Sequence, residues 1–262
     1  MVTLAIAGGV MHPLFELHDQ PQLEPRTSPF NVRGVVYCRM LEEARAIPGG
    51  VTAFRKGLAG EGVADFFTQA FRWTDWYDAL PMNAATLVLA RMAGVEPEVM
   101  ARFGGETTAR QLVPRMFRIL LGFAGMGAAT QHISWILPWF YDFGDARVLA
   151  AGNESTSLLL SDVPRALAAT YVNTILGFMA ATAELIWRTP ATVEYTDVTM
   201  TGERDGFARV SMRCTLRSRR REDGPVLPGT IAPSGTTDAD SRETAIVMVK
   251  PAQHNDRLAG VD

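Results

Sequence analysis

Residues 164–187 read PRALAATYVNTILGFMAATAELIW, and two further stretches, 192–201 and 207–216, follow them. Apolar and Thr side chains recur along the first stretch at the spacing of one helical face, which predicts a long helix. That face consists of Leu167, Tyr171, Thr174, Ile175, Phe178, Met179, Thr182 and Leu185. The two later stretches alternate apolar and polar side chains about a turn at residues 203–206, so they predict a β-hairpin with one buried face.

The segment before this helix predicts a second pair of strands. Residues 145–161 contain two short apolar runs separated by Gly152-Asn153, which is typical of a tight turn. Further upstream, residues 32–113 show helical spacing. The chain therefore predicts an α+β fold, in which an N-terminal helical layer packs on a small, mainly antiparallel sheet and a long helix lies between two strand pairs.

Glycine and proline set the expected boundaries of the N-terminal helices. Residues 48–50 (PGG) predict the end of a first helix, and a later helix over residues 81–93 is expected to end at Gly94. The next helix is expected to begin at Pro97 and to be interrupted at Gly104-Gly105. The aromatic run at residues 73–77 (WTDWY) is expected in a loop or at a helix entry.

The two ends of the chain differ in composition from its middle. Residues 1–31, with several prolines among polar residues, predict an irregular arm, and residues 218–262, rich in Pro, Gly, Ser, Thr and Asp, predict a largely disordered tail. The domain is then expected over residues 32–217. Residues 119–140 contain no charged side chain, but Gly, Thr, Gln, His and Pro interrupt them, which favours a buried helix and a turn over a membrane span.

The composition argues against several classes of protein. The chain has 262 residues, of which 47% are hydrophobic, so it can bury a sizeable core. Its formal net charge of −3 argues against a globally basic protein that binds nucleic acid, and we expect no nucleic-acid partner. Cys38 and Cys214 cannot supply a disulfide scaffold or a four-cysteine zinc site, which favours a reducing, cytoplasmic location.

Complete catalytic and metal-binding motifs are absent from the sequence. It contains no Gly-x-Ser-x-Gly elbow and its four histidines are scattered, so we predict no catalytic group and no metal site. Glu42 and Glu43 are adjacent on a predicted helix and are expected on a solvated face, because neighbouring helical positions point in different directions. The basic run at residues 217–221 is expected to be a solvated linker, although such a run can also contact an acidic partner.

Six short segments carry a resemblance to a known superfamily through their order and spacing. They are residues 32–36 (VRGVV), 76–77 (WY), 102–104 (RFG), 113–115 (VPR), 140–144 (FYDFG) and the terminal helix and hairpin. Over residues 32–216 the chain resembles the small-molecule-binding superfamily that includes haem–nitric-oxide-binding domains, 4-vinyl-reductase-type domains and vesicle-tethering proteins. Within that superfamily it most resembles a myxobacterial conserved family of unknown function.

The resemblance implies a pocket between the helical layer and the sheet that binds a small, often aromatic or tetrapyrrole-like, molecule. Haem binding in the nitric-oxide-binding branch needs an axial histidine and a Tyr-x-Ser-x-Arg run. His132 lies in a suitable region, but Tyr141 is followed by Asp142 and then Phe143, so the run is absent. Haem is therefore a disfavoured cofactor, and the identity of any cofactor stays open.

The strongest evidence for ligand binding is a set of large aromatic side chains near the expected pocket. Aromatic rings stack on ligands, and the polar atoms of Trp and Tyr orient a bound ligand. The predicted ligand-binding residues are Trp73, Trp76, Tyr77, His132, Trp135, Trp139, Phe140 and Tyr141. The alternative is that these side chains simply fill the core.

Together these observations favour a cytoplasmic module that binds or senses a hydrophobic small molecule without catalysing a reaction and that acts through a homodimer or a protein partner. An alternative is an enzyme, or an enzyme accessory protein, of secondary metabolism or pigment synthesis with His132 as the acid/base. A third alternative is a structural or assembly protein that pairs through the helical face at residues 165–187.

Overall fold

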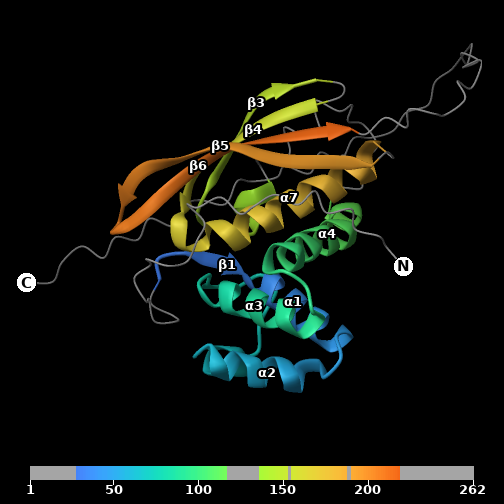
Figure 1. Cartoon of the computed structure of the whole chain (residues 1–262), viewed down its shortest axis with the longest axis vertical. Helices are drawn as coiled ribbons and strands as arrows, with labels where there is room; N and C mark the ends of the chain where they lie inside the picture. The colour runs from blue at the N-terminus through green and yellow to red at the C-terminus, as the bar shows by residue number, and fades with distance from the viewer. Residues whose placement is uncertain (1–27, 117–135, 153–154, 188–189, 219–262) are drawn as a thin grey trace, which may run out of the picture. The chain divides into compact units, whose positions relative to one another are not determined.

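The structure is a computed structural model, and it describes residues 28–116, 136–152, 155–187 and 190–218. The chain divides into two compact units, Met1–Glu222 and Asp223–Asp262. The described residues all belong to the first unit, which Figure 1 shows as a sheet, a long helix beneath it and a group of shorter helices below. The predicted α+β fold is thereby confirmed.

A four-stranded antiparallel sheet forms one layer, in the order β3-β4-β6-β5. Its strands are β3 (Asp145–Ala151), β4 (Ser155–Pro164), β5 (Ala191–Arg204) and β6 (Phe207–Ser218). Both predicted strand pairs are present, and β4 and β6 join them through pairs such as Leu158 opposite Cys214. One face is apolar and lies on the long helix α7 (Arg165–Trp187), because alternate residues of a strand point to the same side.

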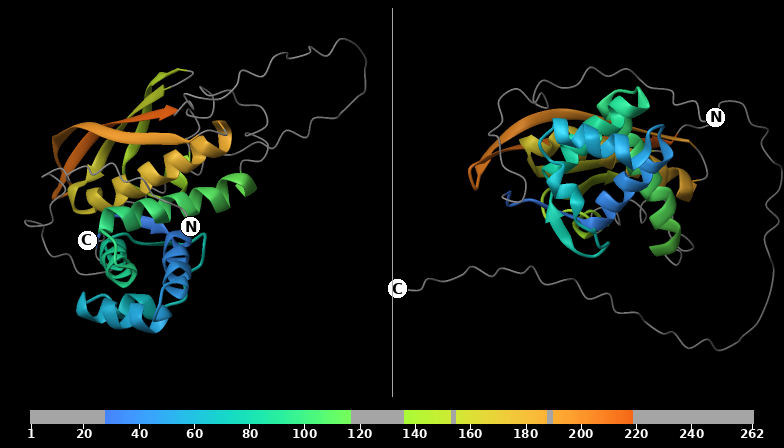
Figure 2. Two further views of the ribbon diagram at one scale, coloured as in Figure 1. Left: turned by 45° about the vertical axis from the view of Figure 1, so that its right-hand side comes forward. Right: turned by 90° about the horizontal axis from the view of Figure 1, so that it is seen from below.

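The N-terminal helices are α1 (Gly34–Ala46), α2 (Gly50–Gly60), α3 (Pro81–Ala93) and α4 (Pro97–Met116). The expected ends at residues 48–50 and at Gly94 are confirmed, and Gly94 has the left-handed backbone typical of a helix C-terminus. The expected break at Gly104-Gly105 was wrong, since α4 continues through both residues. Figure 2 shows α4 lying alongside α7, between that helix and α1–α3.

Helix α4 continues through Gly104 and Gly105 because glycine has no side chain and so allows close contact with α7. A Cβ added to Gly105 would overlap the carbonyl oxygen of Thr174 in α7, and a Cβ added to Gly177 would overlap the carbonyl oxygen of Arg102 in α4. The two helices therefore approach backbone to backbone through a glycine on each. The close packing compensates for the low helix propensity of glycine.

A small second sheet was not predicted. Strand β1 (Asn31–Arg33) pairs with β2 (Trp76–Asp78), so the end of the aromatic run at residues 73–77 forms a strand rather than a loop or a helix entry. Val32 also forms an isolated bridge with Tyr141. Phe30, which the sequence placed in the arm, is buried against Phe143 and Phe207. The short length of both strands explains why alternation gave no signal.

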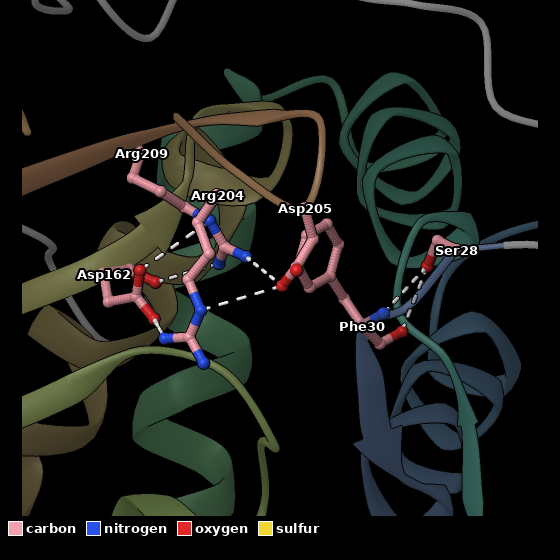
Figure 3. A network of polar contacts seen from close by, with 6 residues as sticks. All are labelled: Ser28, Phe30, Asp162, Arg204, Asp205 and Arg209. Carbon is pink, nitrogen blue, oxygen red and sulfur yellow. Dashed lines mark hydrogen bonds and ion pairs between the residues drawn. The ribbon is translucent and has the colours of Figure 1, made fainter. Parts of the chain in front are cut away.

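Ion pairs connect the β5–β6 turn region to the β-bulge in β4 (Figure 3). Asp162 lies at the β4 bulge with a positive φ of 55° and contacts Arg204 at 2.9 Å and Arg209 at 3.7 Å. The Arg209 guanidinium is buried and lies 4.8 Å from the ring centroid of Phe30. Because Arg209 is withdrawn from water, the Asp162 carboxylate compensates a charge that would be costly alone.

One helix among the described residues is long and apolar enough to cross a membrane by length and composition, and it is the segment Arg165–Leu185 of α7. Of its most apolar window, 78% is buried within the protein, where α4 and the sheet cover it. Most of the stretch at residues 119–140, for which we predicted a buried helix and a turn, lies outside the described residues.

Candidate functional site

A cavity of about 40 Å³ lies among the helices. Residues of α1, α3, α4 and α7 line it, together with the 3-10 turn η3 (Leu137–Trp139) and the two residues that follow the turn. We call this space the helical cavity. Its apolar lining residues are Val36, Met40, Met82, Leu89, Met100, Ala101, Gly104, Leu137, Phe140, Ile175 and Phe178. The resemblance implied a pocket between helices and sheet, whereas none of the described strand residues lines this one.

Three methionines give the helical cavity a wall that can change shape. Met40, Met82 and Met100 come from three different helices, and all are buried. A methionine side chain is unbranched and adopts many rotamers, so it can move to admit a ligand at modest cost. The volume of about 40 Å³, enough for roughly three water molecules, is therefore a resting value that a small apolar guest can enlarge.

Helix α1 supplies the charged part of the wall. Val36, Arg39, Met40 and Glu43 all line the helical cavity, because positions three, four and seven residues apart share one face of a helix. The Arg39 residue is only 5% exposed. Its Nη1 donates a hydrogen bond to Oε2 of the half-exposed Glu42 at 2.5 Å, while its buried Nε has no hydrogen-bond partner within the described part of the chain.

Glu43 carries the second unpartnered polar atom of this wall. Its Oε1 is buried, has no hydrogen-bond partner among the residues that the structure describes, and lies 3.4 Å from the position that a Cβ on Gly104 would occupy. The pKa of Glu43 is raised to about 7 in total: burial is the largest cause and raises it, the positive charge of Arg39 lowers it, and the negative charge of Glu42 raises it. The carboxyl group therefore changes its protonation state near neutral pH.

Hydroxyl groups complete the polar lining. Thr86 donates its hydrogen bond back to the carbonyl oxygen of Met82 within its own helix, at 2.9 Å. Thr108, Thr174 and Tyr141 also line the helical cavity, and burial raises the pKa of the Tyr141 phenol, which keeps it protonated. The wall is thus mainly apolar with a few polar groups, which is the usual chemistry of a small-molecule site.

Six of the eight residues predicted to bind ligand are described, and two of these six, Phe140 and Tyr141, line the helical cavity. Trp73, Trp76 and Trp139 are 44%, 40% and 46% exposed and do not line it. The guanidinium group of Arg33 lies 3.9 Å from the ring centroid of Trp76, and its Nε donates to the Trp139 carbonyl oxygen.

Of the remaining three predicted ligand-binding residues, only Tyr77 is described, and it does not line the helical cavity. Tyr77 packs against Tyr37 and Phe71, and its hydroxyl accepts a hydrogen bond from the Arg72 backbone N–H. His132 and Trp135 lie outside the described residues. Within the described ranges, no group of three His, Cys, Asp or Glu side chains is placed to hold a metal ion.

Sequence reasoning missed Arg39 and placed Glu43 on a solvated face, which was wrong. The structure separates the two adjacent glutamates, since Glu42 is exposed whereas Glu43 turns toward α4. The spacing of Val36, Met40 and Glu43 on one apolar face carried the signal that could have located them. It was outweighed by the general rule that charged residues face water.

Comparisons with known proteins show which solved structures the fold is similar to. No protein-family model and no curated protein matches the chain. Among solved structures, a Cs H-NOX mutant with 4-cyano-L-phenylalanine at site 5 has a TM-score of 0.50 and 12% identity, over 70% of this chain and 96% of that one. The unliganded Fe(II) H-NOX protein from K. algicida has a TM-score of 0.49 and 13% identity, over 74% and 100%.

An oxygen-binding H-NOX domain related to soluble guanylate cyclases, solved as its oxygen complex, has a TM-score of 0.48 and 12% identity, over 73% of this chain and 100% of that one. The resemblance in fold to haem–nitric-oxide-binding domains is confirmed by the first of these neighbours. The closer placement in a myxobacterial family stays a prediction. At such low identity the shared fold does not transfer a ligand, which has to be argued from the site.

Proposed function

We propose that this domain binds a small hydrophobic molecule in the helical cavity and senses it without carrying out chemistry on it. The observation that carries the proposal is the cavity itself, whose lining is mainly apolar and includes Arg39 and Glu43, each with one buried polar atom (Nε and Oε1) that has no partner among the described residues. Such atoms are costly in a folded protein, and a ligand that pairs with them removes the cost. Phe140 and Tyr141 are the predicted aromatic residues that we place against the ligand.

The fold shared with an H-NOX domain raises haem as a candidate ligand. The described lining does not fit haem. It offers thioethers and the protonated phenol of Tyr141, but no imidazole and no thiolate. A volume of about 40 Å³ is also many times smaller than a porphyrin. We therefore propose a smaller guest.

The binding test uses the methionines of the wall as reporters. In the full-length chain labelled with methyl-¹³C methionine, small apolar probes such as xenon or isobutanol should shift the methyl signals of Met40, Met82 and Met100. Met212, which is buried in β6 and does not line the helical cavity, should not move. Equal shifts at Met212, or no shift at any of the three, would contradict the proposal.

A cavity-filling variant separates specific from diffuse binding. Ala101 is buried in α4 and lines the helical cavity, so Ala101→Leu should occupy the space and abolish the probe-dependent shifts. Ala59 is exposed on α2, and Ala59→Leu provides the matched control with the same added volume. Retained binding in Ala101→Leu would place the probe elsewhere. The homodimer, the protein partner and the cytoplasmic location stay predictions.

A further inference from the structure

Arg39 and Glu43 both line the helical cavity, and each holds one buried polar atom without a hydrogen-bond partner among the described residues, Arg39 Nε as a donor and Glu43 Oε1 as an acceptor. They lie one helical turn apart on α1. Only 5% of the Arg39 residue is exposed. Arg39 Nε can only donate a hydrogen bond, and an ionised Glu43 Oε1 can only accept one. A ligand group that satisfies both must therefore carry an acceptor and a donor side by side.

The charges around this pair select against ionic ligands. The Arg39 guanidinium is already paired with the Glu42 carboxylate at 2.5 Å, so its charge is largely balanced. An anionic ligand would be repelled by Glu43, and a cationic group such as an ammonium offers no acceptor for Arg39 Nε. The apolar remainder of the wall gives no further group to balance a charge. A neutral ligand is the one that all three charged side chains tolerate.

We propose that the helical cavity recognises small neutral amides, with the amide oxygen accepting from Arg39 Nε and an amide N–H donating to Glu43 Oε1. This inference rests on the proposed function and names the ligand class of the same site. The hydrocarbon part of the amide then lies against Met40, Met82 and Met100. Short branched aliphatic amides match this wall, because the resting volume is small and the methionines supply the room for a few carbon atoms.

Three probes of nearly equal shape test the ligand class. Isobutyramide carries the acceptor and the donor, 3-methyl-2-butanone carries the acceptor alone, and isobutyrate carries a negative charge. Dissociation constants come from titrating the methyl signals of Met40, Met82 and Met100 in the full-length chain. We expect the amide to bind about tenfold more tightly than the ketone, the usual effect of one hydrogen bond to a charged group, and the carboxylate to bind more weakly than the amide at pH 8.

Adjacent glutamates provide a matched pair of variants. Glu43→Met removes the acceptor from the wall, whereas Glu42→Met removes the same charge from a neighbouring position that does not line the helical cavity. Glu43→Met should weaken amide binding about tenfold and leave ketone binding unchanged. Glu42→Met should leave the preference for the amide in place. Both variants replace a charged side chain with a good helix former, and unfolding midpoints confirm that each is folded.

Failure of this inference is distinguishable from failure of the proposed function. If amide and ketone bind equally to the wild type, or if Glu43→Met and Glu42→Met behave alike, the helical cavity binds small molecules but does not recognise amides. If none of the three probes shifts the methionine signals and xenon and isobutanol do not shift them either, the proposed function fails as well. A tighter carboxylate than amide at pH 8 would overturn the assignment of a neutral ligand.

Discussion

Gly177 of α7 lies directly against the backbone of Arg102 in α4, so that a Cβ at Gly177 would overlap the Arg102 carbonyl oxygen. The relationship is reciprocal, because Gly105 of α4 meets the backbone of α7 at Thr174 in the same way. Thr174 also lines the helical cavity, as do Ala101 and Gly104 on either side of Arg102 in the α4 sequence. The glycine contact therefore sets the spacing of two walls of the site.

Gly177→Ala should destabilise the domain by about 2–4 kcal/mol, because the added methyl group must push two helices apart. The measurement is chemical denaturation followed by circular dichroism. Gly60→Ala is the control, since Gly60 is also helical and nothing lies within 4 Å of an added Cβ. That control should be neutral or stabilising by up to about 1 kcal/mol. Similar unfolding midpoints for Gly177→Ala and the wild type would contradict the predicted overlap.

Asp162→Asn should lower the free energy of unfolding by about 2 kcal/mol, because it leaves the buried Arg209 guanidinium without its main counter-charge. Asn tolerates the positive φ of this position, so the substitution tests charge rather than backbone strain. Arg213→Ala breaks an exposed ion pair with Asp197 and should cost under about 1 kcal/mol. Equal effects of the two substitutions would show that Asp162 contributes no more than a surface pair.

The stability of the protein should fall between pH 5 and pH 8 through Glu43. Its pKa in the folded state is raised to about 7, above the ordinary value of 4.5, so the folded state binds the proton more tightly than the unfolded state does. This contribution is full below about pH 4.5 and is lost as the pH rises through 7.

Glu43→Gln cannot titrate, so it isolates this contribution. Relative to Glu43→Gln, the wild type should lose about 2 kcal/mol between pH 5 and pH 8, a figure reduced for the partial exposure of the carboxyl group. Denaturation at several pH values measures the difference. Glu42→Gln should keep most of the wild-type trend. A constant difference between wild type and Glu43→Gln across this range would show that Glu43 titrates normally.

The two thiols should react at very different rates in the native protein. Cys214 is fully buried in β6, and burial raises its pKa to about 12, whereas Cys38 is partly exposed with a smaller rise in pKa. A disulfide reagent at pH 8 should label Cys38 first, with Cys214 slower by on the order of 100-fold because it needs the domain to open. Cys38→Ser should then remove the fast phase. A fast phase of two thiols per chain would contradict the burial of Cys214.

Exposed tryptophans should contribute little to binding in the helical cavity. Trp76→Phe removes an indole that lies at the surface over Arg33, and we expect it to leave the dissociation constant of isobutyramide unchanged within about twofold. Phe140→Leu alters the wall itself and should change that constant by at least about fivefold. Methyl titrations as above measure both variants. A large effect of Trp76→Phe would support the prediction that Trp76 contacts the ligand.

Local sequence patterns predicted the longer helices and strands well. The helix and hairpin at residues 164–216 and the end of a helix at Gly94 depend on spacing and on punctuation by glycine and proline, which the chain displays directly. The pairing of β1 with β2 did not follow, because each strand has only three residues and gains its stability from a distant partner. Gly104-Gly105 was misread for the same reason, since the packing that keeps α4 intact comes from a helix about seventy residues later.

The same contrast between local sequence patterns and long-range packing applies to the candidate site. By itself the sequence determined the fold class and the order of the longer elements, because these depend on composition and short-range periodicity. The expectation that Phe140 and Tyr141 lie near a pocket came from the family resemblance. Only the tertiary structure decided that the exposed tryptophans stay outside and that Arg39 and Glu43 enter the wall. Whether a charged side chain on a helix meets water or a cavity depends on which other helices cover that face, and that is settled by long-range packing.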